Sequence, residues 1–342
     1  MNKKPDRLFK NKNVAVTGGL GSIGLEIIKK LLESEVRSTI VVDNRETELA
    51  YWMRNSSDDR LRFHFCDIRE FDRVLEMLKG VDLVFHAAAL KHVSVCESNP
   101  FDAVRTNVIG TENLIEACLR DEVEKMILVS TDKAVNPTNV MGATKLLAER
   151  LVSAVCNTGK ERGTEFGVVR FGNVLHSRGS VLEIWDQQLE DGKKITITDP
   201  NMTRFFMDVS QCVYLIFEAT RYTEGGETFI FKMPSVRIGD LAEAYLELRS
   251  CPKDHFVLIG KRPGEKMHEE LVFPEECEGL LENDKFLLRL PFFSKVDMEK
   301  RYRTGFRKAT KTKYSSNDPD NLLSKEKIES TLSRFLGLEQ GY

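Results

Sequence analysis

Short apolar runs alternate with amphipathic stretches along the first half of the chain. The runs are rich in β-branched and aromatic residues and are predicted strands: Asn13–Thr17, Thr39–Val42, Leu61–Phe65, Leu83–Ala87, Met126–Ser130 and Gly167–Phe171. Between them, apolar residues recur at helical spacing over Gly24–Ser34, Phe71–Leu78, Val108–Arg120 and Gly142–Asn157. Nearly continuous apolar strands that alternate with helices are typical of a parallel sheet covered on both faces. The pattern therefore predicts an α/β protein with a Rossmann-type, doubly wound parallel sheet.

Beyond Phe171 the regular alternation stops. Shorter strands and isolated helices, separated by longer loops, are expected at Lys194–Thr198, Thr228–Phe231, His255–Ile259, Val181–Leu189, Ser210–Thr220 and Ile238–Leu248. We therefore expect a cofactor-binding domain over residues 11–171, to which residues 205–232 return. A smaller mixed α/β substrate-binding region is expected over 172–204 and 233–300, and a polar tail with a final helix, Lys325–Leu336, over 301–342.

Composition excludes several classes of protein. The 342 residues include 50 Lys and Arg against 53 Asp and Glu, a net charge of −3, so no global positive field gathers nucleic acid or anionic membrane. No window approaches about 18 uninterrupted apolar residues, so no membrane span is expected. The 7 cysteines, odd in number and without CxxC spacing, indicate reduced thiols in a cytoplasmic protein. The basic stretch Arg301–Lys313 is interpreted as a solvated linker, with an anion-binding tail as the alternative.

A glycine-rich turn, TGGLGSIG at residues 17–24, follows the first predicted strand and leads into an amphipathic helix. Its glycines permit a tight turn, close approach of the backbone to a pyrophosphate, and close packing of helix on strand. The pyrophosphate of a dinucleotide would lie on the helix N-terminus, where free N–H groups and the helix dipole attract it. A purely structural glycine turn is the alternative, but the strand–turn–helix context favours the dinucleotide. The residues expected to bind it are Gly18, Gly21, Ser22, Ile23 and Gly24.

The second predicted strand is followed by Asp43, 19 residues after Gly24. A carboxylate there accepts hydrogen bonds from the adenosine ribose and repels a 2′-phosphate, which favours NAD over NADP. Arg45 complicates this preference, because a guanidinium could bind that phosphate. Asp67, after the third strand, is placed either to meet the adenine amino group or to cap a helix. The remaining residues expected at the cofactor are Ile68, Ala87 and Ala88.

Two further polar segments lie at strand ends, the edge at which open α/β sheets bind ligands. They are HAAALKHV at residues 86–93 and STDKAVNPTNVMGATK at residues 130–145. Both resemble the extended short-chain dehydrogenase/reductase superfamily, and the second resembles the nucleotide-sugar 4,6-dehydratases that act on UDP-N-acetylglucosamine. The resemblance continues through VRFGNVLHSRGSV, MTRFFM and RPGEKMHEEL and covers roughly residues 12–275. It implies NAD as the cofactor and a UDP-sugar as the substrate.

In that superfamily the proton chemistry depends on a Tyr-x-x-x-Lys pair, since residues i and i+4 stand together on a helix face. Here the lysine is Lys145 and the tyrosine position is Met141. Methionine cannot transfer a proton, so the usual acid/base assignment fails. A branch of the UDP-N-acetylglucosamine dehydratases carries methionine at this position, and this chain resembles that branch.

The resemblance implies that Asp132 and Lys133 serve carbons 5 and 6 of the sugar. Lys133 would remove the carbon 5 proton, and Asp132 would protonate the departing carbon 6 hydroxyl. A base lysine needs a depressed pKa, which burial and the neighbouring Lys145 could supply. Thr131 is then the nearest hydroxyl to polarise O4, whose proton passes to Asp132 or to water. A surface turn before Asn136 is the structural alternative for this segment.

The substrate-binding residues are inferred from the same resemblance, with solvated side chains as the alternative. An arginine can fork onto a diphosphate, and a carboxylate can accept from a ribose diol. Amide groups and helix N-terminal N–H groups can hold phosphate or uridine. The residues inferred are Lys91, His92, Asn173, Ser180, Val181, Arg204, Arg262 and Glu265. No metal site is expected, because His268 has no partner ligand at a suitable spacing.

These features predict a UDP-N-acetylglucosamine 4,6-dehydratase that keeps NAD bound through a redox-neutral cycle. It would form UDP-2-acetamido-2,6-dideoxy-4-keto-hexose by hydride transfer from carbon 4 to carbon 6 with loss of water. The resemblance to the methionine branch favours retention at carbon 5. The alternatives are a nucleotide-sugar 4-epimerase, a 4-keto reductase and a catalytically silent NAD-binding regulatory protein. A homo-oligomer is expected, because helices that flank the sheet often pair in this superfamily.

Overall fold

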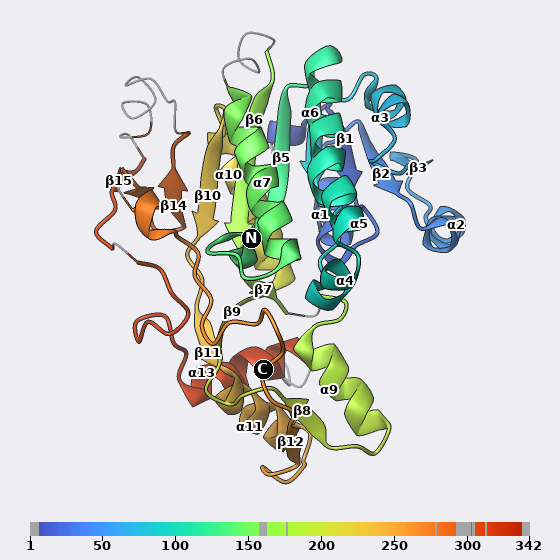
Figure 1. Cartoon of the computed structure of the whole chain (residues 1–342). Coiled ribbons are helices and arrows are strands. Elements are labelled where there is room, and N and C mark those ends of the chain that lie inside the picture. The colour runs from blue at the N-terminus through green and yellow to red at the C-terminus, as the bar shows by residue number, and fades with distance from the viewer. Residues whose placement is uncertain are drawn as a thin grey trace.

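The computed structural model describes residues 7–156, 163–175, 177–277, 279–291, 302, 305–311 and 313–336. Within them, a sheet of ten strands has the order β15-β13-β14-β10-β6-β5-β4-β1-β2-β3 (Figure 1). Its parallel strands are β1 (Asn13–Thr17), β2 (Ser38–Asp43), β3 (Leu61–Phe65), β4 (Leu83–His86), β5 (Lys125–Thr131), β6 (Glu165–Phe171) and β10 (Glu227–Phe231). The order β3-β2-β1-β4-β5-β6 is that of a dinucleotide-binding, doubly wound sheet, so the predicted fold class is confirmed.

Side chains of the parallel strands alternate between two buried faces. One face, which includes Val14, Val16 and Phe85, packs against α1 (Ser22–Leu32) and α10 (Val209–Tyr222). The opposite face is covered by α3 (Phe71–Leu78), α6 (Gly110–Arg120) and α7 (Val140–Ala154). Burial on both faces explains why β1, β2, β4 and β5 are nearly continuous apolar runs, whereas the edge strand β3 is largely exposed.

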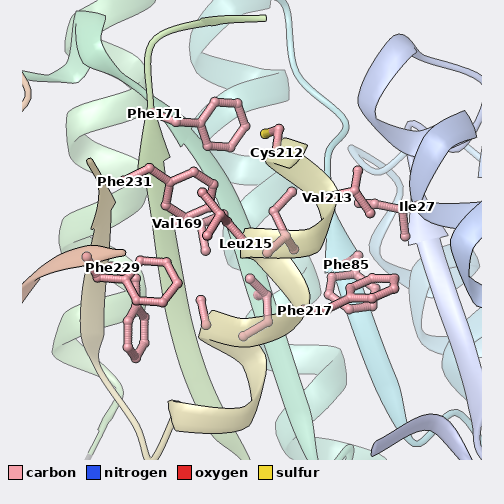
Figure 2. Close-up of a cluster of buried hydrophobic side chains, with 14 of the residues drawn as sticks. Ile27, Phe85, Val169, Phe171, Cys212, Val213, Leu215, Phe217, Phe229 and Phe231 are labelled. Atoms are coloured by element: carbon pink, nitrogen blue, oxygen red, sulfur yellow. The ribbon is translucent and has the colours of Figure 1, made fainter. Parts of the chain in front are cut away.

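Figure 2 shows the packing of α10 on the first face, where Leu215 and Phe217 lie against strand residues. The rings of Phe85 and Phe217 have centroids 5.5 Å apart, and those of Phe171 and Phe231 stack at 5.1 Å. Burying one such side chain stabilises the fold by about 1.5–3 kcal/mol. This packing holds β4 and β6 firmly, and with them the loops at their carboxyl ends.

A smaller lobe lies beyond the carboxyl ends of the parallel strands (Figure 1). It contains one sheet of β7 (Asn173–Val174), β9 (Thr203–Met207) and β11 (Ser235–Arg237), and a pair of β8 (Ile195–Ile197) with β12 (Phe256–Leu258). Its helices are α9 (Val181–Glu190), α11 (Ile238–Leu248) and α13 (Lys325–Phe335). Trp185 and Tyr245 are fully buried in a hydrophobic core of its own.

The C-terminal region differs from the solvated linker expected over Arg301–Lys313. Tyr302 and Phe306 are buried against the main sheet, and β15 (Arg307–Lys308) pairs with β13 (Leu281–Glu282). β13 in turn pairs antiparallel with β14 (Phe286–Arg289), which lies beside β10. Strands this short carry too little periodicity to be recognised in the sequence.

The remaining elements are helices α2 (Glu46–Asn55), α4 (Val93–Ser98) and α5 (Pro100–Val104), a π-helical stretch (Arg105–Ile109), and 3-10 helices (Arg7–Phe9, Asp132–Ala134, Pro274–Glu276). Asn157, the predicted end of the helix after β5, lies outside the described residues. No helix in the described part of the chain combines the length and apolarity needed to cross a bilayer.

Candidate active site

The glycine-rich turn between β1 and α1 has the backbone geometry that a pyrophosphate requires. Gly18 has a φ of +63°, and a Cβ there would lie 2.7 Å from the Ala88 backbone, so β4 and its following Ala87 and Ala88 pass directly over the turn. Within the described part of the chain, no side chain accepts a hydrogen bond from the first N–H groups of α1. The turn therefore leaves uncapped N–H groups at a helix N-terminus, where the pyrophosphate of NAD fits. The predicted residues of this turn are Gly18, Gly21, Ser22, Ile23 and Gly24.

Asp43, at the end of β2, faces this turn with a fully hydrogen-bonded carboxylate. Its Oδ2 accepts from the Leu20 N–H (3.1 Å) and from Arg45 Nη2 (2.9 Å), and its Oδ1 accepts from the Arg45 N–H (3.1 Å) and Nε (2.9 Å). Burial opposes the charged form of Asp43, but the hydrogen bonds from Arg45 outweigh it and lower the pKa. Arg45 therefore screens the carboxylate, and a ribose that binds Asp43 must displace it.

Asp67 has a similar arginine partner of its own. Arg69 donates to it from Nε (3.0 Å) and Nη2 (2.6 Å), and these hydrogen bonds lower the pKa of Asp67. Glu70, not Asp67, occupies the N-cap position of α3, so the helix-cap alternative for Asp67 is wrong. Ile68 is buried beside it. Asp67 stays a prediction as an adenine contact, and Ile68 stays a prediction as a cofactor-binding residue.

The catalytic candidates lie where β5 ends. Thr131 Oγ1 donates to Asp132 Oδ1 (2.9 Å), which also accepts from Lys133 Nζ (2.8 Å). Asp132 is fully buried, and its Oδ2 has no hydrogen-bond partner among the described residues. The structure thus contradicts the surface-turn alternative. A buried carboxylate oxygen without a partner costs free energy, and a polar ligand would satisfy it.

The pKa of Lys133 is raised, whereas a lowered pKa was expected for a base. Burial lowers its pKa, but the charges of Asp132 and Glu269 outweigh burial and raise it. The expectation was wrong because it counted the charge of Lys145 and missed these two carboxylates. The resting structure therefore holds Lys133 as an ammonium ion paired with Asp132.

Glu269 is a site residue that the sequence analysis missed. It is 3% exposed, and its Oε2 has no hydrogen-bond partner among the described residues. Arg204 Nε and Lys266 Nζ each lie 4.0 Å from one of its oxygens. Burial and the charge of Asp132 raise its pKa. The paired acids in KMHEEL were the available signal, but nothing local shows that one of them turns toward β5.

Lys145 and Met141 lie one turn apart on α7 in different surroundings. Lys145 Nζ donates to the Val129 carbonyl (2.6 Å), and burial lowers its pKa to about 8 against the opposing charge of Glu149. Met141 is buried in a small apolar cluster with Cys96. A buried apolar side chain therefore occupies the position at which the superfamily has its tyrosine.

Three hydrogen bonds join the RPGEK segment, residues 262–266, to the segment that follows β5. Thr138 Oγ1 and Asn139 Nδ2 donate to the Gly264 carbonyl (2.8 and 3.1 Å), and Lys266 Nζ donates to the Val135 carbonyl (2.5 Å). These bonds hold the predicted nucleotide-binding turn at the N-terminus of α7, beside the Asp132–Lys133 pair.

Arg204 and Glu265, both predicted to bind substrate, contact each other in the structure. Arg204 Nη2 lies 3.2 Å from Glu265 Oε1, and the Arg262 N–H donates to Glu265 Oε2 (3.2 Å). Arg204 is 8% exposed, whereas Arg262 is exposed. A diphosphate would therefore compete with Glu265 for Arg204.

The predicted substrate residues at the start of the smaller lobe include two unsatisfied groups. Asn173 Oδ1 and Ser180 Oγ are buried and have no hydrogen-bond partner within the described residues. Ser180 and Val181 begin α9 without a side-chain cap. Lys91 donates to a backbone carbonyl of the loop before α9, and burial lowers its pKa. The His92 ring packs against the same loop.

Residues 14–289 match the family described as polysaccharide biosynthesis protein. An uncharacterized membrane protein of Methanocaldococcus jannaschii is 48% identical and covers 96% of this chain and 97% of its own length. A UDP-N-acetylglucosamine 4,6-dehydratase (inverting) of Campylobacter jejuni is 37% identical and covers 85% of this chain and 86% of its own. A UDP-glucose 4-epimerase of Rickettsia canadensis is 39% identical, and the match covers 79% of this chain and 80% of that protein.

A solved structure supports the same fold. Pen from Bacillus thuringiensis has a TM-score of 0.87 to this chain at 37% identity, and the match covers 95% of this chain and 99% of that one. The likeness therefore extends over both lobes.

Proposed function

Because this chain belongs to the polysaccharide biosynthesis protein family of extended short-chain dehydrogenases/reductases, we propose that it is an NAD-dependent nucleotide-sugar enzyme, a UDP-N-acetylglucosamine 4,6-dehydratase. The observation that carries the proposal is the Thr131–Asp132–Lys133 cluster, where one buried carboxylate oxygen binds a hydroxyl and an ammonium. Loss of water from neighbouring carbons needs an acid and a base together, and this cluster supplies both.

When bound, NAD supplies the reversible two-electron oxidation of sugar carbon 4 and the later reduction of carbon 6. The glycine turn would hold its pyrophosphate, and Asp43, which is hydrogen-bonded to Arg45 in this structure, would hold its adenosine ribose. Lys145, by its likeness to the superfamily lysine, holds the second ribose. Because the cycle is redox-neutral, the cofactor needs no exchange between turnovers.

The first proton to leave the sugar is that of the O4 hydroxyl. Thr131 already donates to Asp132, so the O4 proton passes through the Thr131 hydroxyl to Asp132. Once Asp132 is protonated, it loses the charge that raises the pKa of Lys133, and that pKa falls. Lys133 then gives its proton to Glu269, whose pKa burial still raises after Asp132 has lost its charge. Oxidation of carbon 4 thereby prepares Lys133 as a base.

Neutral Lys133 removes the carbon 5 proton, which the carbon 4 ketone has made acidic. Asp132 protonates the carbon 6 hydroxyl, which leaves as water. Lys133 later returns its proton to carbon 5, and Glu269 returns its proton to Lys133. Each group ends in the protonation state in which it began, and the net change is the loss of one water.

The test is to incubate the purified protein with UDP-N-acetylglucosamine and no added reductant. We expect a product lighter by one water, with a carbon 4 ketone and a carbon 6 methyl group, identified by mass spectrometry and NMR. Recovery of unchanged sugar would contradict both the dehydratase and any 4-epimerase acting on it.

We propose retention at carbon 5, supported by Met141 and its resemblance to the methionine branch. The Campylobacter jejuni relative, in contrast, is named as inverting. Running the reaction in deuterated water and assigning carbon 5 by NMR distinguishes the two outcomes. An L-configured hexose product would contradict retention.

A UDP-hexose 4-epimerase is the second candidate, favoured by the Rickettsia canadensis relative of that name. An epimerase gives a product of unchanged mass and inverted carbon 4. Parallel incubations with UDP-glucose and UDP-N-acetylglucosamine therefore separate it from a dehydratase.

A further inference from the structure

The loop between β7 and α9 reaches from the smaller lobe to the glycine turn. The Arg178 N–H donates to Ser22 Oγ (2.8 Å), and Arg178 Nη2 donates to the Leu20 carbonyl (2.9 Å). Lys91 Nζ donates to the Arg178 carbonyl (2.6 Å). We call residues Ser177–Ser180 the Arg178 strap. Its contacts place one arginine, distant in sequence, at the start of α1, where the pyrophosphate fits.

Gly179 allows the strap to follow this path. It has a φ of +70°, and a Cβ on it would lie 2.8 Å from the His92 ring. The segment after β4, which carries Lys91 and His92, therefore supports the strap from the other side. Three parts of the chain converge at this point.

The charge of Arg178 is only partly neutralised. Glu48, the carboxylate that it approaches, lies 4.0 Å from Nη1 and is also paired with Arg45 at 3.4 Å. Asp43 is fully hydrogen-bonded by other groups, chiefly Arg45. The Arg178 side chain is 46% exposed. A guanidinium with spare donors therefore stands beside the uncapped start of α1.

We propose that Arg178 binds the pyrophosphate of NAD, opposite the N–H groups of α1, and that the Arg178 strap closes over the cofactor. A pyrophosphate carries two negative charges, and the glycine turn offers it backbone N–H groups but no cationic side chain. An arginine meets that need, because it can donate two parallel hydrogen bonds to phosphate oxygens. The inference rests on the proposed function only in taking NAD as the dinucleotide.

The test measures NAD binding directly, by titration calorimetry on protein stripped of cofactor. Arg178→Ala should weaken NAD binding about 10- to 100-fold, the usual effect of losing a charge-assisted hydrogen-bond pair. Arg178→Lys should recover part of the affinity, because it keeps the charge. Arg73→Ala, at a surface arginine of α3, is the matched control and should bind like the wild type.

The NAD content of the protein as purified gives a second reading, which should fall in Arg178→Ala alone. An unchanged Kd in Arg178→Ala would overturn the inference, as would an Arg178→Lys variant no better than the alanine. Unchanged melting temperatures exclude unfolding as the cause. Wild-type protein that binds NAD but yields no dehydrated sugar would overturn the proposed function and leave this inference standing.

Discussion

Asp132 binds a hydroxyl and an ammonium through the same carboxylate oxygen, an arrangement that couples two proton transfers. A proton that arrives through Thr131 removes the negative charge on which the ammonium form of Lys133 depends. The base of the second step is therefore produced by the first. In the proposed mechanism, this coupling lets Lys133 act as a base although its pKa is raised at rest.

We expect Asp132 and Lys133 to carry the acid/base chemistry. Asp132→Asn or Lys133→Ala should lower kcat by at least about 100-fold, because each removes an acid/base group. Bound NAD should be retained in both. Met141→Ala should cost far less, since Met141 contributes packing only. Steady-state kinetics and cofactor content check this, and a strong loss from Met141→Ala but not from Asp132→Asn would reverse the assignment.

Glu269→Gln should lower kcat by about 10- to 100-fold, because Lys133 loses its proton acceptor. The sugar KM should change little. The variant also removes a negative charge near Lys133, so the pKa of Lys133 falls and the rising limb of the pH–rate profile should move to lower pH. Glu269→Asp should restore part of the rate. A loss of rate with an unmoved limb would indicate a purely structural role.

The pKa of Lys145 is expected to set the upper pH limit of NAD binding. Burial lowers its pKa to about 8, so the side chain is cationic below that pH and loses its charge above it. NAD affinity should therefore be full on the acidic side and decline as pH rises through about 8. Lys145→Arg should move the decline to higher pH. Equal NAD affinity at pH 7 and pH 9.5 in the wild type would contradict this.

Residues whose role is visible within a short motif could be predicted, and those whose role depends on distant partners could not. The glycine turn and the Asp132–Lys133 pair each lie directly after a predicted strand. Glu269 and Arg178 act on segments more than 100 residues away, and no local pattern records such a contact.

Among the elements, β1, β2, β4 and β5 were predictable because burial on both faces makes them nearly continuous apolar runs. The short strands β13 and β15 were not, because two residues define no period. Their position beside β10 is set by tertiary contacts. The burial of Tyr314 near β9 in a polar-looking segment was missed for the same reason.

A buried ion network joins four elements behind the catalytic pair. Arg170 on β6 is fully buried and donates to Glu149 of α7 (2.6 Å) and to Glu276 (2.7 Å). Glu149 also accepts from Ser130 Oγ (2.5 Å), which lies next to Thr131 on β5. The network therefore fixes β5, β6 and α7 relative to one another and to the 3-10 helix Pro274–Glu276.

Arg170→Met should lower the free energy of unfolding by about 3–5 kcal/mol, because it leaves buried Glu149 without its cation and leaves Glu276 paired chiefly with Arg289 (3.3 Å). Chemical denaturation measures this. The control is Arg73→Met, which breaks an exposed pair with Glu76 and should change stability by less than about 1 kcal/mol. Equal effects of the two substitutions would contradict a structural role for the network.

At the scale of the whole molecule, exposed apolar side chains support the expected homo-oligomer. Phe101 and Val104 on α5 are 81% and 42% exposed, and Leu147 on the neighbouring α7 is 48% exposed. Apolar side chains grouped on packed helices often mark contact with a second copy.

Phe101→Asp should therefore shift the protein to a monomer, measured by size-exclusion chromatography with light scattering. Ile184→Asp, at a side chain that is 41% exposed on α9 of the smaller lobe, is the control and should leave the assembly unchanged. A wild-type protein that is monomeric at tens of micromolar would refute the expectation.

The cytoplasmic location expected from the sequence stays a prediction, and the Methanocaldococcus jannaschii relative is named a membrane protein.

The chain passes between the two lobes several times. It leaves the main sheet after β6, returns for α10 and β10, leaves for α11, returns for β14, and ends with α13 in the smaller lobe (Figure 1). No continuous stretch of the gene therefore encodes the smaller lobe, and a single exchange of one gene segment cannot replace it. A change in the smaller lobe therefore has to be made within segments that also connect the strands of the main sheet.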